Sequence, residues 1–137
     1  MSDHESARAL ERWLRYARDD LRSAEILLVE SGVPRNSCFL AQQAAEKSIK
    51  AIFVALQIDF PFTHDLNRLL DLLPEDWEMK EKLPGLTDLS DWAVEPRYPG
   101  DMPEATEDDA REAVRMAREV YETTISEIEA RGFGAEP

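Results

Sequence analysis

Apolar residues recur at three- and four-residue steps between residues 6 and 30, where they form one continuous stripe. This spacing predicts a long amphipathic helix. We expect the helix to end at Gly32, which can adopt a left-handed cap, because Pro34 cannot continue a helix. Four arginines lie on the face opposite the stripe: Arg8, Arg12, Arg15 and Arg22.

A second helix is predicted from about residue 36 to residue 56, where small residues are mixed with bulky apolar ones. Small side chains let neighbouring helices approach closely, so we expect this helix at the centre of a bundle. Thr63 is well placed to cap a short third helix that ends near Leu73. A weaker helical stretch at 75–95, interrupted at Pro84-Gly85, and a proline-rich loop to about residue 103 follow.

The last predicted helix begins near Thr106, where acidic residues favour a helix start, and ends at Gly132. Together these elements predict an all-α fold, an up-and-down antiparallel bundle of four to five helices. We expect residues 1–137 to form a single domain, with a core that spans about residues 6–131.

The formal charge of −13 changes this picture, because it is confined to one part of the chain. Residues 1–57 contain eight basic and eight acidic residues, whereas residues 58–137 contain eight basic and 21 acidic residues. An acidic surface repels phosphate backbones, so nucleic-acid binding is disfavoured. We therefore expect any anionic ligand at the neutral first part.

The single cysteine, Cys38, allows neither an intramolecular disulfide nor a cysteine metal cluster. The N-terminal segment lacks the apolar core of a signal peptide, and no apolar run approaches the ~18 residues that a membrane helix needs. We expect a cytoplasmic protein that does not associate with membranes. Cys38 is expected to be a buried thiol, and His4 and His64 alone predict no metal site and no catalytic residue.

A polar strip on the second helix is the first candidate for chemistry. Gln43, Glu46, Lys47 and Lys50 are spaced so that they share one helix face. One interpretation is a solvated strip with a Glu46–Lys50 ion pair. The other is a polar wall that binds an anion or a partner protein.

Two further segments leave similar alternatives open. His64 lies at a predicted helix start, where free backbone N–H groups favour phosphate, but it could equally decorate a turn. Arg97 and Tyr98 lie in the proline-rich loop, where they could contact a phosphate and stack on a base, or simply anchor the loop.

In this order, these segments resemble the HEPN domain family over roughly residues 10–130. The most specific motifs are Gln43-x-x-Glu46-Lys47-x-x-Lys50-Ala51 and the Thr63-His64-Asp65-Leu66 helix start. The resemblance implies a bundle that is often a homodimer. Within the family, the chain is similar to stand-alone prokaryotic members and to the C-terminal domain of sacsin. Such members are commonly encoded beside a small nucleotidyltransferase, in some cases as a toxin–antitoxin pair.

The ribonuclease branch of that family carries an arginine, four to six further residues and then a histidine. Here the positions that would pair with His64 are Gln57, Ile58 and Asp59, and His4 has no room for a partner. The ribonuclease motif is therefore absent, and we expect no enzymatic activity.

The resemblance thus implies a non-nuclease module that binds a nucleotide, a nucleotidyltransferase partner, or both. An ATP-like nucleotide is the expected ligand, and no cofactor is required. Its site would contain Gln43, Lys47, Lys50, His64, Arg97 and Tyr98. Two alternatives remain, a ribonuclease with a non-standard site and a purely structural dimerisation module.

Overall fold

The computed structural model describes residues 3–83, 85–93 and 104–133. The all-α prediction is confirmed, and six α-helices rather than four to five occur in these residues. The difference arises because the 75–95 stretch forms two one-turn helices and a 3-10 turn. The elements are α1 (Asp3–Val29), α2 (Pro34–Leu56), α3 (Leu66–Asp71), α4 (Met79–Lys82), α5 (Thr87–Ser90), η1 (Asp91–Ala93) and α6 (Glu107–Ala130).

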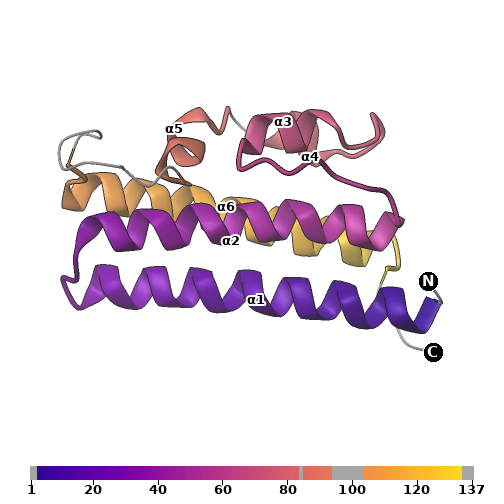
Figure 1. Cartoon of the computed structure of the whole chain (residues 1–137), viewed down its shortest axis with the longest axis horizontal. Helices are drawn as coiled ribbons and strands as arrows, with labels where there is room; N and C mark the ends of the chain where they lie inside the picture. The colour runs from indigo at the N-terminus through magenta and orange to yellow at the C-terminus, as the bar shows by residue number, and fades with distance from the viewer. Residues whose placement is uncertain (1–2, 84, 94–103, 134–137) are drawn as a thin grey trace.

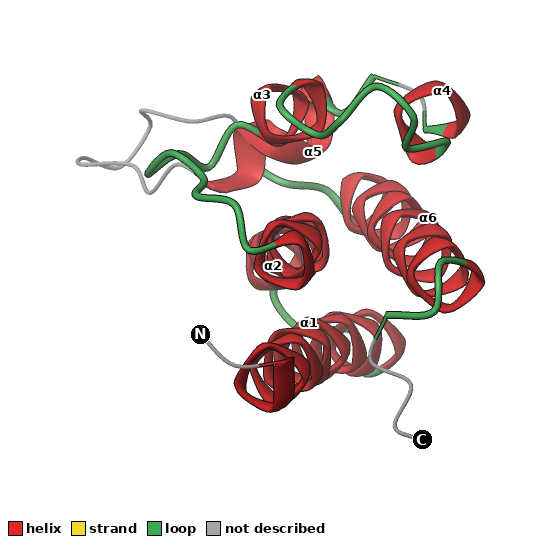
Figure 2. Cartoon of the chain, turned by 90° about the vertical axis from the view of Figure 1, so that its right-hand side faces the viewer, coloured by secondary structure: helices red, strands yellow, loops and turns green. Residues whose placement is uncertain are grey.

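The three long helices pack side by side, and the short helices cover the side of α2 and α6 that lies away from α1 (Figures 1 and 2). Helix α2 runs antiparallel to α1, and α6 runs in the same direction as α2 (Figure 1). Helices α2 and α6 can run in the same direction because α3, α4 and α5 lie between them in the sequence. The chain passes through these short helices on its way back to the end of the bundle where α2 begins. None of the described helices is both long and apolar enough to cross a membrane.

Helix α2 is the centre of the bundle, as its small residues predict. It packs against α1 and α6 and also contacts α3, α5 and η1. Four of its five alanines are completely buried, which allows the neighbouring helices to approach closely. These are Ala41, Ala44, Ala45 and Ala51.

The turn between α1 and α2 differs from the sequence prediction. Ser31, with φ of 54°, adopts the left-handed conformation that was expected of Gly32. Gly32 is needed for a different reason, because a Cβ at this position would lie 2.8 Å from Leu27 Cδ2. The glycine therefore permits close approach of the turn to α1, where its N–H donates to the Leu27 carbonyl at 2.7 Å.

The start of α3 also differs from the prediction, because Asp65 and not Thr63 is its cap. The Asp65 carboxylate accepts hydrogen bonds from the backbone N–H groups of Asn67 and Arg68. Thr63 lies two residues earlier, where its hydroxyl accepts from the Asp65 N–H at 3.1 Å. The helix is also shorter than predicted, since it ends at Asp71.

The predicted start and end of α6 are confirmed. Thr106 and Asp109 form a capping box, in which each side chain accepts a hydrogen bond from the other residue's backbone N–H. At the other end, Gly132 has φ of 80°, a conformation that favours glycine.

Residues 57–65 connect α2 to α3 by running back along α2. The Phe60 ring packs against Phe53 and Trp13, with centroids 5.7 and 5.9 Å apart. Four residues later His64 reaches Glu46, almost two helical turns before Phe53. This path places a histidine from the connecting segment directly on the polar strip of α2.

Candidate functional site

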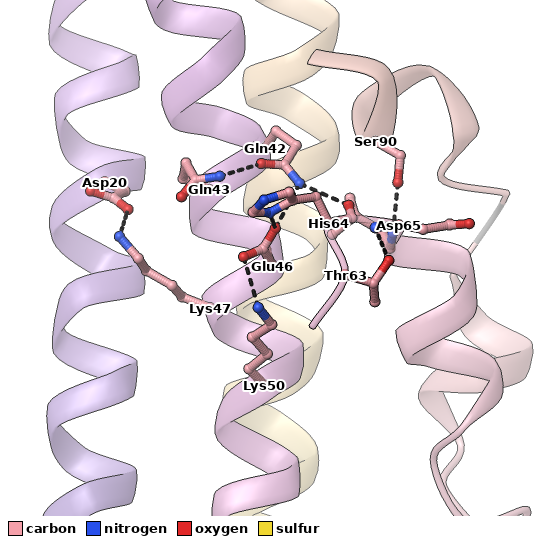
Figure 3. A network of polar contacts seen from close by, with 11 residues as sticks. Asp20, Gln42, Gln43, Glu46, Lys47, Lys50, Thr63, His64, Asp65 and Ser90 are labelled. Atoms are coloured by element: carbon pink, nitrogen blue, oxygen red, sulfur yellow. Dashed lines mark hydrogen bonds and ion pairs between the residues drawn. The ribbon is translucent and has the colours of Figure 1, made fainter. Parts of the chain in front are cut away.

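Glu46 is the centre of a polar network that links α2 to the 57–65 segment (Figure 3). Its side chain is only 6% exposed. One carboxylate oxygen accepts from His64 Nδ1 at 2.7 Å and from Gln42 Nε2 at 3.2 Å. The other accepts from Lys50 Nζ at 3.0 Å. Both oxygens of this buried carboxylate are therefore hydrogen-bonded.

The network keeps Glu46 ionised although burial opposes ionisation. Desolvation raises the pKa of Glu46, but hydrogen bonds from His64, Lys50 and Gln42 and the charge of Lys50 outweigh it, and the pKa is lowered. Glu46 is thus a buried anion, and its role is to bind and orient the donors around it.

His64 connects this buried anion to the surface. Its side chain is 56% exposed, while Nδ1 faces the Glu46 carboxylate. An ionised carboxylate can only accept hydrogen bonds. Nδ1 therefore carries a hydrogen and donates a hydrogen bond to Glu46. Nε2 has no hydrogen-bond partner in the described part of the chain and is left for a ligand. When the ring is protonated, Nε2–H is a charged donor.

Two glutamines complete the network on the same stretch of α2. Gln42 is completely buried, and its amide also donates to the His64 carbonyl at 3.1 Å. Gln43 is partly buried and donates to the Gln42 side-chain oxygen at 2.7 Å. The backbone and the ring of His64 are therefore both fixed to α2.

The two lysines of the strip occupy different environments. Lys50 is 10% exposed and lies 5.3 Å from the centroid of the Phe60 ring, so it faces inward. The interpretation of a solvated strip is therefore wrong at this position, because the Glu46–Lys50 pair is present but buried. Lys47 is 28% exposed and forms an ion pair with Asp20 of α1 at 2.5 Å. Lys47 is the lysine that a surface ligand can reach.

The backbone at the start of α3 offers few donors to a ligand. The Leu66 N–H donates to the Ser90 hydroxyl at 2.6 Å, and the next two N–H groups donate to Asp65. The expectation of free N–H groups beside His64 is therefore wrong. The exposed His64 ring is the group that a ligand can reach at this end of α3, and its Nε2 accepts a hydrogen bond when the ring is neutral and donates one when it is protonated.

Of the predicted site residues, Lys50 and His64 contact Glu46 directly, Gln43 joins the network through Gln42, and Lys47 pairs with Asp20 of α1 instead. Arg97 and Tyr98 lie outside the described residues. Sequence reasoning missed Gln42 and Asp20, although the four-residue spacing of Gln42 and Glu46 was a signal for the former. It also missed Phe62, whose ring centroid lies 6.3 Å from that of His64.

Other reactive groups in the described residues have structural roles. Glu127 is 9% exposed and accepts from the N–H groups of Glu78 and Met79 and from the Arg131 guanidinium. It therefore fastens α4 to α6. Cys38 is a buried free thiol, as predicted. Burial raises its pKa to about 11, so it is a poor nucleophile at neutral pH.

The fold and the network define a helical bundle whose central helix carries a buried, ionised carboxylate bound to a surface histidine. The family model of the HEPN domain matches residues 10–128. The chain therefore belongs to the HEPN domain family.

Two solved structures resemble the chain over most of its length. TT1696 from Thermus thermophilus is 28% identical with a TM-score of 0.72, and the match covers 86% of this chain and 97% of that one. ST0689, described as an archaeal HEPN homologue, is 27% identical with a TM-score of 0.68, and the match covers 87% of this chain and 97% of that one. A comparison with curated proteins gave no match.

Proposed function

We propose that this chain is a non-nuclease HEPN protein that binds the phosphate end of an ATP-like nucleotide at His64. The observation that carries the proposal is the hydrogen bond between the ionised Glu46 and His64 Nδ1, which leaves the opposite ring nitrogen for a ligand. In the protonated ring, Nε2–H is a positive donor at the surface.

The charges around His64 support an anionic ligand. Asp20 and Glu46 are each paired with one lysine, so these four side chains contribute no net charge. Protonation of His64 adds one positive charge to this group. Lys47 and Gln43 are proposed as additional donors from α2, whereas Lys50 acts indirectly by holding Glu46.

The proposal extends to assembly. A homodimer of the chain is the proposed assembly, and a small nucleotidyltransferase that shares its nucleotide with this surface is the proposed partner. The pair would resemble a toxin–antitoxin system. Family membership supports these points. Arg97 and Tyr98, which lie outside the described residues, are proposed as further nucleotide contacts.

Calorimetric titration with ATP tests the proposal. The unmodified protein is expected to bind, and His64→Ala is expected to weaken binding about 10- to 100-fold, because a hydrogen bond to a charged group contributes about 1.5–3 kcal/mol. His4→Ala is the matched control, since the exposed His4 on α1 forms no part of the network. Absence of both heat and a rise in melting temperature at millimolar ATP would contradict nucleotide binding.

The same variants separate the two alternatives. A ribonuclease would cleave RNA, and the cleavage would disappear in His64→Ala. A purely structural module would bind no ATP, and substitution of His64 would alter only its oligomeric state in sedimentation.

A further inference from the structure

Phe62 is an aromatic side chain that the described part of the chain leaves uncovered. Its exposed fraction is 101%, so both faces of the ring are in solvent. Exposure of a large apolar side chain costs free energy that burial would recover. The other phenylalanine of this segment behaves differently, since Phe60 packs against the core.

Residues on both sides of Phe62 in the sequence are fixed to the bundle, which keeps the Phe62 ring in solvent. Two residues before it, Phe60 is fixed between Phe53 and Trp13. Two residues after it, His64 is fixed to α2 through its ring and its carbonyl. Pro61 lies between the two phenylalanines and restricts the backbone further. Phe62 is therefore an exposed ring on a segment with little freedom to turn it inward.

Phe62 also lies next to the proposed phosphate donor. The centroids of the Phe62 and His64 rings are 6.3 Å apart, with an angle of 61° between the ring planes. A planar group that stacks on Phe62 would thus place its substituents close to the histidine.

We propose that Phe62 is the stacking platform for the base of a purine nucleotide whose phosphates bind at His64. This inference rests on the proposed function and adds the class of base. Stacking on an aromatic side chain needs no hydrogen bonds to the base, and it favours the base with the larger ring system. The site therefore prefers purine to pyrimidine nucleotides.

Titration with three probes tests the inference: ATP, CTP and inorganic triphosphate. In Phe62→Ala, the affinity for ATP is expected to fall about tenfold or more, and the affinity for triphosphate to stay unchanged. The preference for ATP over CTP should disappear in the same variant. Phe62→Trp should retain ATP binding, because it restores an aromatic face.

Two controls make the result specific. Leu72→Ala removes another exposed apolar side chain, 49% exposed, from a different part of the surface and should leave all affinities unchanged. His64→Ala should weaken ATP and triphosphate alike. Because Phe62 is fully exposed, its replacement should not alter the circular dichroism spectrum.

The failures of the two proposals are distinguishable. If ATP binds and Phe62→Ala leaves its affinity unchanged, or weakens ATP and triphosphate equally, the stacking role is overturned while phosphate binding stands. If neither ATP nor triphosphate binds to the unmodified protein, both proposals are overturned. If Phe62→Ala changes only self-association, the residue is a protein contact and not a base platform.

Discussion

Glu46 is the residue on which the site depends, because a buried carboxylate is stable only when its charge is compensated. Removing one partner from a buried ion pair leaves the other charge uncompensated and costs about 3 kcal/mol. Here Lys50, His64 and Gln42 together provide the compensation. The same contacts that stabilise Glu46 also fix the direction of the His64 ring, so stability and site geometry have one origin.

This coupling predicts a pH dependence of folding. The pKa of Glu46 is lowered below its ordinary value of 4.5 in the folded protein. Glu46 therefore contributes stability that is fully present above pH 4.5 and is lost as the pH falls through the folded-state pKa, because the unfolded chain takes up the proton first. Denaturant unfolding between pH 7 and pH 3 should show Glu46→Gln less stable at neutral pH and less sensitive to acid.

Glu81→Gln is the control for this measurement, because Glu81 is exposed and its substitution removes the same formal charge without touching the network. It should follow the acid dependence of the unmodified protein. An unchanged acid dependence in Glu46→Gln would show that the carboxylate is not held as the network requires.

The partners of the strip could not be predicted from local spacing. Helical periodicity predicts that Gln43, Lys47 and Lys50 share one face of α2. It says nothing about Asp20, which is 27 positions from Lys47, or about His64, which is 18 positions from Glu46. These contacts depend on how α1 and the 57–65 segment pack against α2, which only the folded chain shows.

Helix ends show how far the sequence determines the individual elements. The capping box of α6 is local, since Thr106 and Asp109 satisfy each other, and it was predictable. The cap of α3 was less clear because Thr63 and Asp65 are both good capping residues, and the Ser90 contact favours a start at Leu66. The one-turn helices α4 and α5 depend on burial of apolar residues such as Met79 and Leu89, and so lacked a periodic signal.

The two left-handed residues at helix ends that are not glycine predict stabilising substitutions. Ser31 and Gln57 have φ of 54° and 55°, values that residues other than glycine adopt only with backbone strain. Ser31→Gly and Gln57→Gly should each increase the free energy of unfolding by about 0.5–1 kcal/mol, measured by urea denaturation.

Ser23→Gly is the control, because glycine at this position should lower the free energy of unfolding instead of raising it. Ser23 is exposed in the middle of α1, where glycine lowers helix stability by about 0.5 kcal/mol. A loss of stability in Ser31→Gly comparable to that in Ser23→Gly would mean that the turn after α1 does not require the left-handed conformation.

At the scale of the whole molecule, the long apolar stripes were sufficient to predict the bundle. Their periodicity persists over α1 and α6, and the small residues of α2 identified the central helix. The distribution of charge was also informative, because Glu46 and its partners lie almost entirely in the neutral first part of the chain. Arg111, Arg115 and Arg118 of the acidic second part each form an ion pair with a glutamate.

The central claim is that Glu46 acts on a ligand through His64, and a double-mutant cycle on ATP affinity tests it most directly. Glu46→Gln and His64→Ala should each weaken binding, and the double variant should bind no more weakly than His64→Ala alone, because the carboxylate acts only by holding the ring. Circular dichroism would verify that each variant is folded. Independent, additive losses, or full affinity in Glu46→Gln, would contradict the account.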